Sequence, residues 1–393
     1  MTDDLGPDPL AAMAPPTPTE GDESDERRAP LRAWLAAHPH PTGRELAAAG
    51  LVAPQWPEPW GRGADASYQL LIDDELARAG VARPSNPIGV GWAGPTLLYA
   101  GTDDQRARWL PSLLSGEELW CQLFSEPDAG SDLASLTTTA RRDGDEWVVT
   151  GQKIWTSYAH AATWGILLAR TSSDGPAHHS ISYFVCPMRA KGVTVRPLVD
   201  MTGLHTFNQV FLDEVRLPAD HLIGDLNDGW RLAKVTLGNE RVSLSAEGAL
   251  WGRGPTAAQL VAMVRDRAIA HDAALTDELV RCWIDGEILR LLRQRLVQAA
   301  VTGRPPGPEA SVRKALADHH GQVVMALAQR LAGAAGLLAG RGPGGVAGDE
   351  GALWSYGWLF SPALTIGGGT SIVQRTIIAE RVLGLPKEPQ SSA

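Results

Sequence analysis

The chain has 393 residues, 44% of them hydrophobic, enough to bury a large core in one multi-part unit or in two to three domains. A formal net charge of −10 and the lack of a basic cluster with interleaved aromatics exclude an obvious nucleic-acid surface. No stretch approaches the roughly 20 apolar residues that span a bilayer, and the N-terminus is acidic, so we expect a cytoplasmic protein without a membrane span. The widely spaced Cys121, Cys186 and Cys282 indicate neither a disulfide framework nor a zinc site, and no metal is expected.

The N-terminal part divides into a tail and a helical segment. Residues 1–30 are rich in Pro, Asp and Glu and contain few β-branched or aromatic residues, which predicts a disordered tail. Residues 31–119 are predicted to form an N-terminal α domain. Within it Tyr68, Leu71, Ile72 and Leu76 recur at helical spacing and predict an amphipathic helix.

Residues 120–225 have a different texture, with short runs rich in Val, Ile, Trp, Tyr and Thr separated by Gly, Asp, Ser and Pro. These runs predict antiparallel strands of a middle β domain, at residues 146–157, 163–171, 179–188, 193–198 and 208–218.

Residues 226–393 return to helical spacing and predict a C-terminal α-helical domain. One long helix is predicted from a cap at Asp277 to a stop at Gly303, and another over residues 312–336. The order of helices, strands and helices predicts an α+β fold ending in a helical bundle, rather than a Rossmann fold.

The densest motif runs from Gln122 to Asp132 (QLFSEPDAGSD) and is followed one strand later by residues 151–157 (GQKIWTS). A flavin needs hydrogen-bonding groups at its ring edge and a flat apolar surface against one face. Ser125 and Ser157 can supply hydroxyls, Trp155 the surface, and Gly130 a close backbone approach. The alternative is that Trp155 is a strand-core aromatic and the serines are turn residues.

At these two motifs the chain resembles the acyl-CoA dehydrogenase family, whose loop reads roughly TEPxAGSD and whose later strand reads GxKxWITN. The likeness extends from about Val52 to Pro386. It implies FAD as cofactor, with the Ser157 hydroxyl beside flavin N5, Trp155 packed on the ring and Ser131 touching the acyl-CoA ligand. On this likeness the cofactor-binding residues are expected to be Gln122, Leu123, Phe124, Ser125, Gly130, Ser131, Trp155, Thr156, Ser157 and Thr370.

A second motif, residues 366–375 (IGGGTSIVQR), is a Gly-rich loop that opens a helix predicted to reach about Leu383. Thr370 or Ser371 can cap this helix, and its free N–H groups can meet polar groups of a flavin nucleotide. The motif resembles the family's Tyr-Glu-Gly-Thr segment, which often supplies the catalytic base. Gly368 occupies the aligned position, so that carboxylate is absent.

Two other glutamates are candidates for a base that removes the α-proton of a thioester. Glu240 and Glu247 lie seven residues apart, so on one helix they share a face about 10 Å apart, and each has apolar neighbours one turn away. Local surroundings do not choose between them. The resemblance favours Glu240, because isovaleryl- and long-chain-type enzymes place the base on this helix immediately before an Arg, here Arg241. Arg241 is then expected near the substrate; the alternative is a Glu240–Arg pair on a solvated face.

The chain also departs from the family pattern. An R-x-x-F-G segment whose Arg reaches the flavin pyrophosphate of a neighbouring subunit is replaced here by residues 264–271 (VRDRAIAH), with Arg265 or Arg267 as substitutes. Ile372 replaces the Glu of the usual TSEIQR. These departures are similar to those of actinobacterial relatives that pair two unlike subunits and act on bulky, steroid-like acyl chains.

The sequence therefore predicts a flavoprotein oxidoreductase of lipid metabolism that carries out FAD-dependent α,β-dehydrogenation of an acyl-CoA or acyl-carrier thioester. Glu240 would take the α-proton, flavin N5 the β-hydride, and an electron-transfer flavoprotein the electrons, in a homo- or hetero-oligomer. Two alternatives stay open. One is a flavin-dependent oxidase or monooxygenase of the same fold, and the other is a non-catalytic partner subunit of a heteromeric dehydrogenase.

Overall fold

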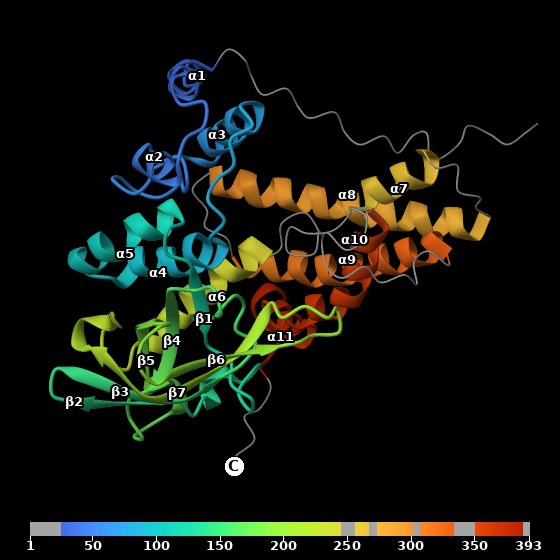
Figure 1. The fold of residues 1–393 in the computed structure, drawn as a ribbon. Helices are drawn as coiled ribbons and strands as arrows, with labels where there is room; N and C mark the ends of the chain where they lie inside the picture. The colour runs from blue at the N-terminus through green and yellow to red at the C-terminus, as the bar shows by residue number, and fades with distance from the viewer. Residues whose placement is uncertain (1–24, 245–255, 267–272, 302–306, 334–349, 388–393) are drawn as a thin grey trace, which may run out of the picture. The chain divides into compact units, whose positions relative to one another are not determined.

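The computed structural model describes residues 25–244, 256–266, 273–301, 307–333 and 350–387 (Figure 1). The chain divides into two compact units. One, the sheet unit, comprises residues 20–200 and 205–240; the other, the C-terminal unit, comprises residues 1–19, 201–204 and 241–393.

The sheet unit opens with short helices connected by turns. They are α1 (Arg28–Ala37), α2 (Gly43–Ala48), α3 (Ala66–Arg78), the π-helical turn Gly89–Ala93, α4 (Gly94–Ala100) and α5 (Asp103–Ser115). Helix α3 confirms the predicted amphipathic stripe, since Leu71, Ile72 and Leu76 are all buried.

Helix α1 begins inside the segment predicted to be a tail. Arg28 is buried, and its Nη1 donates to Oδ2 of Asp74 at 2.7 Å and also to Glu75, both on α3. Two charge-assisted bonds to another helix order residues that composition alone predicts to be disordered. Residues 1–24 lie outside the described part of the chain.

Eight strands form one sheet in the described part of this unit. They are β1 (Trp120–Leu123), β2 (Thr139–Asp143), β3 (Glu146–Lys153), β4 (Trp164–Arg170), β5 (Ile181–Pro187), β6 (Val193–Leu198), β7 (Phe207–Pro218) and β8 (Leu222–Ile223). The order is β6-β7-β3-β2-β4-β5-β8, and β1 also pairs with β4. Short 3₁₀ turns lie at Leu133–Ser135, Ala177–His179 and Ala219–His221.

The five predicted strand runs correspond to β3 through β7, whereas β1 was not among the predicted runs and is not antiparallel. This strand runs parallel to β4, with Cys121 opposite Gly165, and β2 meets β4 in one parallel bridge. Strand β1 enters the sheet from helix α5 rather than through a hairpin, so no tight turn imposes an antiparallel neighbour.

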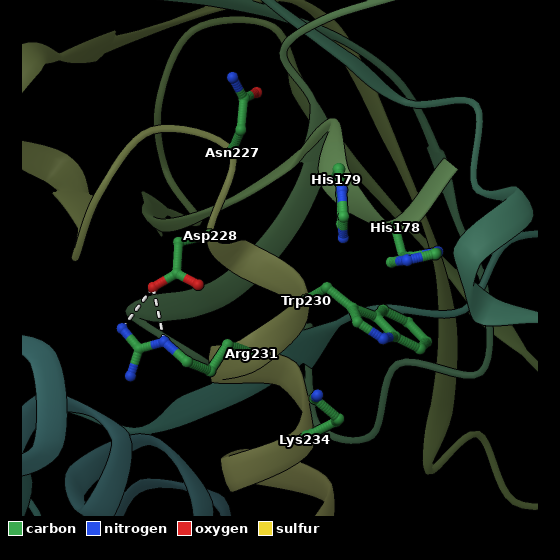
Figure 2. Close-up of a pocket in the computed structure, with 7 residues that line it drawn as sticks. All are labelled: His178, His179, Asn227, Asp228, Trp230, Arg231 and Lys234. Carbon is green, nitrogen blue, oxygen red and sulfur yellow. Dashed lines mark hydrogen bonds and ion pairs between the residues drawn. The ribbon is translucent and has the colours of Figure 1, made fainter. Parts of the chain in front are cut away.

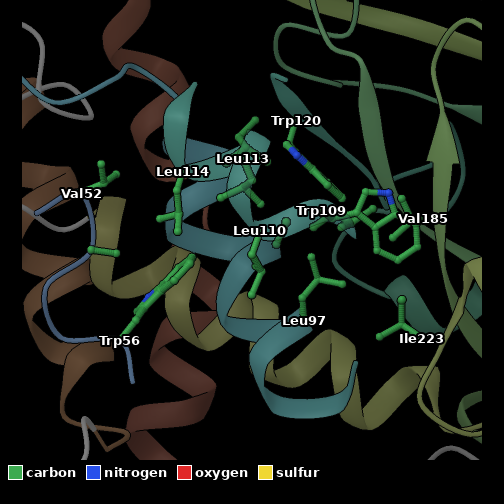
Figure 3. Packing of buried hydrophobic residues seen from close by; sticks show 14 of the residues in the cluster. Val52, Trp56, Leu97, Trp109, Leu110, Leu113, Leu114, Trp120, Val185 and Ile223 are labelled. Atoms are coloured by element: carbon green, nitrogen blue, oxygen red, sulfur yellow. The ribbon is translucent and has the colours of Figure 1, made fainter. Parts of the chain in front are cut away.

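Helices α4 and α5 pack on this sheet through a hydrophobic cluster that includes Leu97, Leu110 and Leu113 (Figure 3). Trp109 of α5 is fully buried and lies edge-on to Trp120 of β1 and Trp164 of β4, at centroid distances of 6.5 and 5.9 Å. Buried aromatics contribute large contact areas and preferred edge-to-face geometry. The packing therefore holds β1, and the loop that follows it, in a defined position.

Helix α6 (Gly229–Leu244) is joined to the sheet unit by buried hydroxyls. Thr236 Oγ1 lies 2.8 Å from Oγ1 of Thr96 on α4 and 3.1 Å from the hydroxyl oxygen of Tyr183 on β5. Burying polar groups is costly unless they are paired, so these contacts favour one position of α6 against α4 and β5.

The C-terminal unit contains α7 (Ala257–Asp266), α8 (Ala273–Val301), α9 (Ala310–Ala332), α10 (Glu350–Phe360) and α11 (Ser371–Ile377), with a 3₁₀ turn at Ser361–Thr365 and a π-helical turn at Ile378–Val382. The prediction of a cap at Asp277 was wrong, because α8 begins four residues earlier. Asp277 instead accepts from Nε of Arg281, one turn on, at 2.8 Å. Gly303 lies outside the described residues.

No helix among the described residues has the length and apolar character needed to cross a membrane. The same part of the chain contains no group of three His, Cys, Asp or Glu side chains that could hold a metal ion.

Candidate functional site

The two motifs singled out in the sequence meet at one end of the sheet. The backbone N–H of Ile154, just after β3, donates to the carbonyl oxygen of Ser125 at 2.9 Å. Lys153 Nζ donates to the carbonyl oxygen of Phe124 at 3.1 Å. The loop after β1 and the end of β3 therefore form one connected surface.

A buried ion pair joins the same two segments. Lys153 Nζ lies 2.8 Å from Oε1 of Glu126, with side chains 0% and 4% exposed. Oε2 of Glu126 accepts from the N–H and the hydroxyl of Thr137 at 2.6 and 2.7 Å. Burial alone would raise the pKa of Glu126, but the Lys153 charge and these hydrogen bonds lower it to about 2. Burial lowers the pKa of Lys153 to about 8 against the opposing effect of Glu126.

The segment after β3 is held in a rare backbone conformation. Trp155 and Tyr158 both have φ of 58°, in the left-handed region that bulky residues seldom adopt. Asn208 on β7 brackets the segment, since its carbonyl oxygen accepts from Thr156 N at 3.1 Å and its Nδ2 donates to Thr156 O at 3.0 Å. A backbone held this way by a neighbouring strand is typical of a functional site.

Trp155 does not belong to the strand core. Its side chain is 55% exposed, and its ring meets the edge of Phe207 at a centroid distance of 5.9 Å. The strand-core alternative is therefore wrong, and a broad aromatic surface remains accessible.

The other predicted cofactor residues differ in what they can offer. The side chains of Leu123 and Phe124 are buried in the core, so they can present only backbone groups. Ser125 and Ser157 are half-buried, Ser131 and Gly130 are exposed, and no serine hydroxyl of this group bonds to another described residue. The hydroxyl of Thr156 and Oε1 of Gln122 are buried without a partner in the described part of the chain. Because buried polar atoms are usually paired, this edge fits a polar ligand such as a flavin ring.

Glu240 lies near the end of the described part of α6 and is only 7% exposed. Gln122 Nε2 on β1 donates to Oε2 of Glu240 at 3.2 Å. The structure thus joins a predicted cofactor residue and the predicted base, and the solvated-face alternative for Glu240 is wrong. The side chain of Arg241 and the whole of Glu247 lie outside the described residues.

The Gly-rich loop lies in the C-terminal unit. Gly368 and Gly369 have φ of 69° and 91°, and Nε2 of the buried Gln374 donates to their carbonyl oxygens at 2.9 and 3.2 Å. Thr370 Oγ1 accepts from Val373 N at 3.3 Å, which confirms the predicted cap. The regular α-helix ends at Ile377 and continues as a π-helical turn to Val382, close to the predicted end at about Leu383.

The substitutes proposed for the missing R-x-x-F-G arginine are only partly visible. Arg265 lies on α7, and Arg267 falls outside the described residues. Ile372, which replaces a Glu of the family motif, is strongly exposed on α11.

Sequence reasoning missed a cavity of about 340 Å³ at the start of α6 (Figure 2). It is lined by His178, His179, Asn227, Asp228, Trp230, Arg231 and Lys234. Arg231 Nε donates to Oδ2 of Asp228 at 2.7 Å, and its Nη1 donates to the hydroxyl of Tyr99 at 2.7 Å. The available signal was the pair of basic residues in the first turns of a helix, but the histidines come from a distant loop.

Comparisons with known proteins agree with this architecture. Three family models match in chain order: acyl-CoA dehydrogenase N-terminal domain (residues 24–117), middle domain (121–215) and C-terminal domain (227–383). Acyl-CoA dehydrogenase FadE34 of Mycobacterium tuberculosis is 45% identical over 342 residues, covering 87% of this chain and 46% of the relative, so the chain spans about half its length. Acyl-CoA dehydrogenase IpdE1 of the same organism is 39% identical over 359 residues, covering 91% and 88%.

Solved structures show the same fold. The structure described as Tcur3481-Tcur3483 steroid ACAD has a TM-score of 0.75 and 30% identity, over 92% of this chain and 97% of that one. The ChsE4-ChsE5 complex from Mycobacterium tuberculosis has a TM-score of 0.72 and 29% identity, over 98% and 100%.

The fold and these matches define a flavin-dependent oxidoreductase that uses FAD. More narrowly, the chain belongs to the acyl-CoA dehydrogenase family, whose activity is dehydrogenation of acyl-CoA thioesters. The predicted family, α+β fold class and cofactor are confirmed, whereas the roles of individual site residues stay predictions.

Proposed function

We propose that this protein oxidises an acyl-CoA, or a related acyl-carrier thioester, to its α,β-unsaturated product, with Glu240 as the base. The observation that carries the proposal is a carboxylate buried beside the flavin motif and held there by Gln122. The α C–H bond breaks and its proton goes to Glu240; the electron pair forms the new double bond, and the β-hydrogen leaves as hydride. FAD supplies the two-electron acceptor for that hydride. A base in a partly dry pocket has a pKa closer to the working pH than an exposed carboxylate.

The protein's own contribution to FAD binding would come from the edge where the two motifs meet. Trp155 offers a flat face, and Ser125, Thr156 and Ser157 offer hydroxyls that no other described residue pairs with. The backbone of Gln122, Leu123, Phe124 and Gly130 would line the ring edge, and Thr370 is a further predicted cofactor contact. Ser131 and Arg241 would contact the thioester.

The cavity at the start of α6 supports CoA as the carrier. The nucleotide end of CoA is a polyanion with an adenine ring, and Lys234, His178 and His179 offer cationic or hydrogen-bonding groups around Trp230 (Figure 2). Lys234→Met should therefore raise KM for an acyl-CoA several-fold while leaving KM for the same acyl-pantetheine thioester unchanged. Equal changes for both thioesters would argue against a CoA site here.

An unlike partner subunit is also part of the proposal. The relative FadE34 has room for a second segment of similar length, and two similar structures carry paired names. The missing R-x-x-F-G segment and the steroid ACAD similarity favour a hetero-oligomer acting on a bulky, steroid-like acyl group. Electrons would leave to an electron-transfer flavoprotein.

The test is anaerobic bleaching of bound flavin by a panel of acyl-CoA thioesters, with Glu240→Gln and Glu247→Gln as the matched pair. Glu240→Gln should keep FAD yet lose bleaching, while Glu247→Gln should keep both. Undiminished bleaching in Glu240→Gln would remove Glu240 from the mechanism and turn attention to Glu247. A chain that is colourless even beside its partner would support the non-catalytic subunit, and rapid reoxidation by air the oxidase or monooxygenase.

A further inference from the structure

We infer that Gln122 is a positioning residue whose side-chain amide orients the Glu240 carboxylate and keeps it ionised. The inference rests on the proposed function, because it takes Glu240 as the base. It goes beyond that proposal because it assigns the side chain of Gln122 to positioning the base. The proposed function gives a role in cofactor binding only to the backbone of Gln122.

The contact joins two elements that are each fixed independently. Gln122 lies on β1, opposite Ile166 of β4, in the strand that Trp109 packs against. Glu240 lies one turn after Thr236, whose hydroxyl is bonded to Thr96 and Tyr183. The 3.2 Å contact between Gln122 Nε2 and Glu240 Oε2 therefore forms between preorganised partners, although 118 positions separate them in sequence.

The chemistry of an amide makes the direction of this bond informative. An N–H donor stabilises a carboxylate more than a carboxylic acid, so it opposes the effect of burial, which favours the protonated form. The other end of the amide, Oε1 of Gln122, is buried without a partner among the described residues. Among the described residues, no competing bond to that oxygen draws the amide away from Glu240.

The elements that pack here carry other titratable groups in their described parts. Strand β1 (WCQL) carries only the buried Cys121, and α4 (GPTLLYA) carries only Tyr99, which accepts from Arg231. Along α6, Lys234 lies on an earlier turn and Arg241 follows Glu240 directly. On β5 the buried Tyr183 is bonded to Thr236. Gln122 is thus a neutral donor at this carboxylate.

The experiment compares Gln122→Met and Gln122→Glu holoenzymes by the pH profile of kcat/KM for anaerobic flavin reduction. Methionine keeps the length and removes the donor, so the acid limb should move up by about one pH unit, the equivalent of one hydrogen bond to a charged group. Glutamate places a second carboxylate within one hydrogen-bond length, so the limb should move further and split into two steps. FAD content should stay at the wild-type level. The matched control is Gln69→Met, at a half-buried position on α3, and it should leave the pH profile unchanged.

An acid limb that stays at the wild-type pH in both variants overturns the inference. Loss of FAD from both variants also overturns it, since the side chain would then serve the cofactor. These failures are distinct from failure of the proposed function. If Glu240→Gln still bleaches, the base is wrong; if Glu240→Gln is inactive while the Gln122 variants are unshifted, only the positioning role is wrong.

Discussion

Nζ of Lys153 lies 2.8 Å from Oε1 of Glu126, and this buried pair joins the loop after β1 to the end of β3. The same ammonium also donates to the carbonyl oxygen of Phe124, so one side chain organises both flavin motifs. The positions of Ser125 and Trp155 therefore depend on the Lys153–Glu126 ion pair, in which neither residue takes part.

Lys153→Met should destabilise the protein by about 3–5 kcal/mol and sharply lower its FAD content. The reason is that Glu126 would stay buried without its counter-charge, which costs far more than the pair itself contributes. Urea unfolding and the ratio of flavin to protein absorbance measure the two effects.

The matched control is Arg216→Met. Arg216 is 55% exposed and pairs with Asp143 and Glu146 at 3.0 and 2.8 Å. Exposed pairs are worth less than about 1 kcal/mol, so the midpoint of unfolding should barely move. Equal losses in the two variants would mean that burial of the Lys153–Glu126 pair is not what matters.

The same pair predicts a pH dependence of stability. The pKa of Glu126 is lowered from an ordinary 4.5 to about 2 in the folded protein. A carboxyl with a lowered folded pKa adds stability above its unfolded pKa and loses it as pH falls toward the folded value. The difference in unfolding free energy between wild type and the double variant Glu126→Gln/Lys153→Met should therefore be constant from about pH 7 to 5. Below about pH 4.5 the wild type should lose stability relative to the double variant. A constant difference down to pH 3 would contradict the lowered pKa.

Much of this architecture follows from local sequence patterns. The stripe of Leu71, Ile72 and Leu76 predicts α3, and runs rich in β-branched and aromatic residues predict β3 to β7. What the patterns missed depends on distant partners. Four residues of β1 are too few to show periodicity, and its parallel pairing is decided by β4.

The site shows the same division between local and distant information. The motifs identify Trp155 and Glu240 as candidates, but the left-handed backbone of Trp155 depends on Asn208, and the burial of Glu240 beside Gln122 depends on packing of α6 against the sheet. No spacing rule connects residues 122 and 240. The Asp277 error is of the opposite kind, because an Asp that satisfies a cap pattern serves equally well in an i,i+4 ion pair.

The backbone at Trp155 predicts an unusual order of stability among variants. At φ of 58°, any residue with a Cβ is strained by about 1 kcal/mol relative to Gly. Trp155→Gly should therefore be more stable than Trp155→Ala by about that amount, although both should bind FAD poorly. Thermal unfolding of the two variants measures the difference.

Trp358 provides the comparison, because it is an exposed Trp inside helix α10. There Ala should be more stable than Gly by about 1 kcal/mol, the ordinary helix order. If Ala also exceeds Gly at position 155, the left-handed conformation is not maintained in solution.

The Gly-rich loop offers the last test, because Gly369 combines a left-handed backbone with a close neighbour. A Cβ at Gly369, where φ is 91°, would lie 2.6 Å from Nε2 of Gln374, the atom that holds the carbonyl oxygens of Gly368 and Gly369. The backbone of Gly63 is also left-handed, with φ of 57°, but a Cβ at Gly63 would meet no atom within 4 Å. Gly63→Ala should cost about 1 kcal/mol from the backbone alone. Gly369→Ala should cost clearly more, and should also lower FAD affinity if Thr370 contacts the cofactor. Equal unfolding midpoints for the two variants would show that Gln374 does not hold the loop.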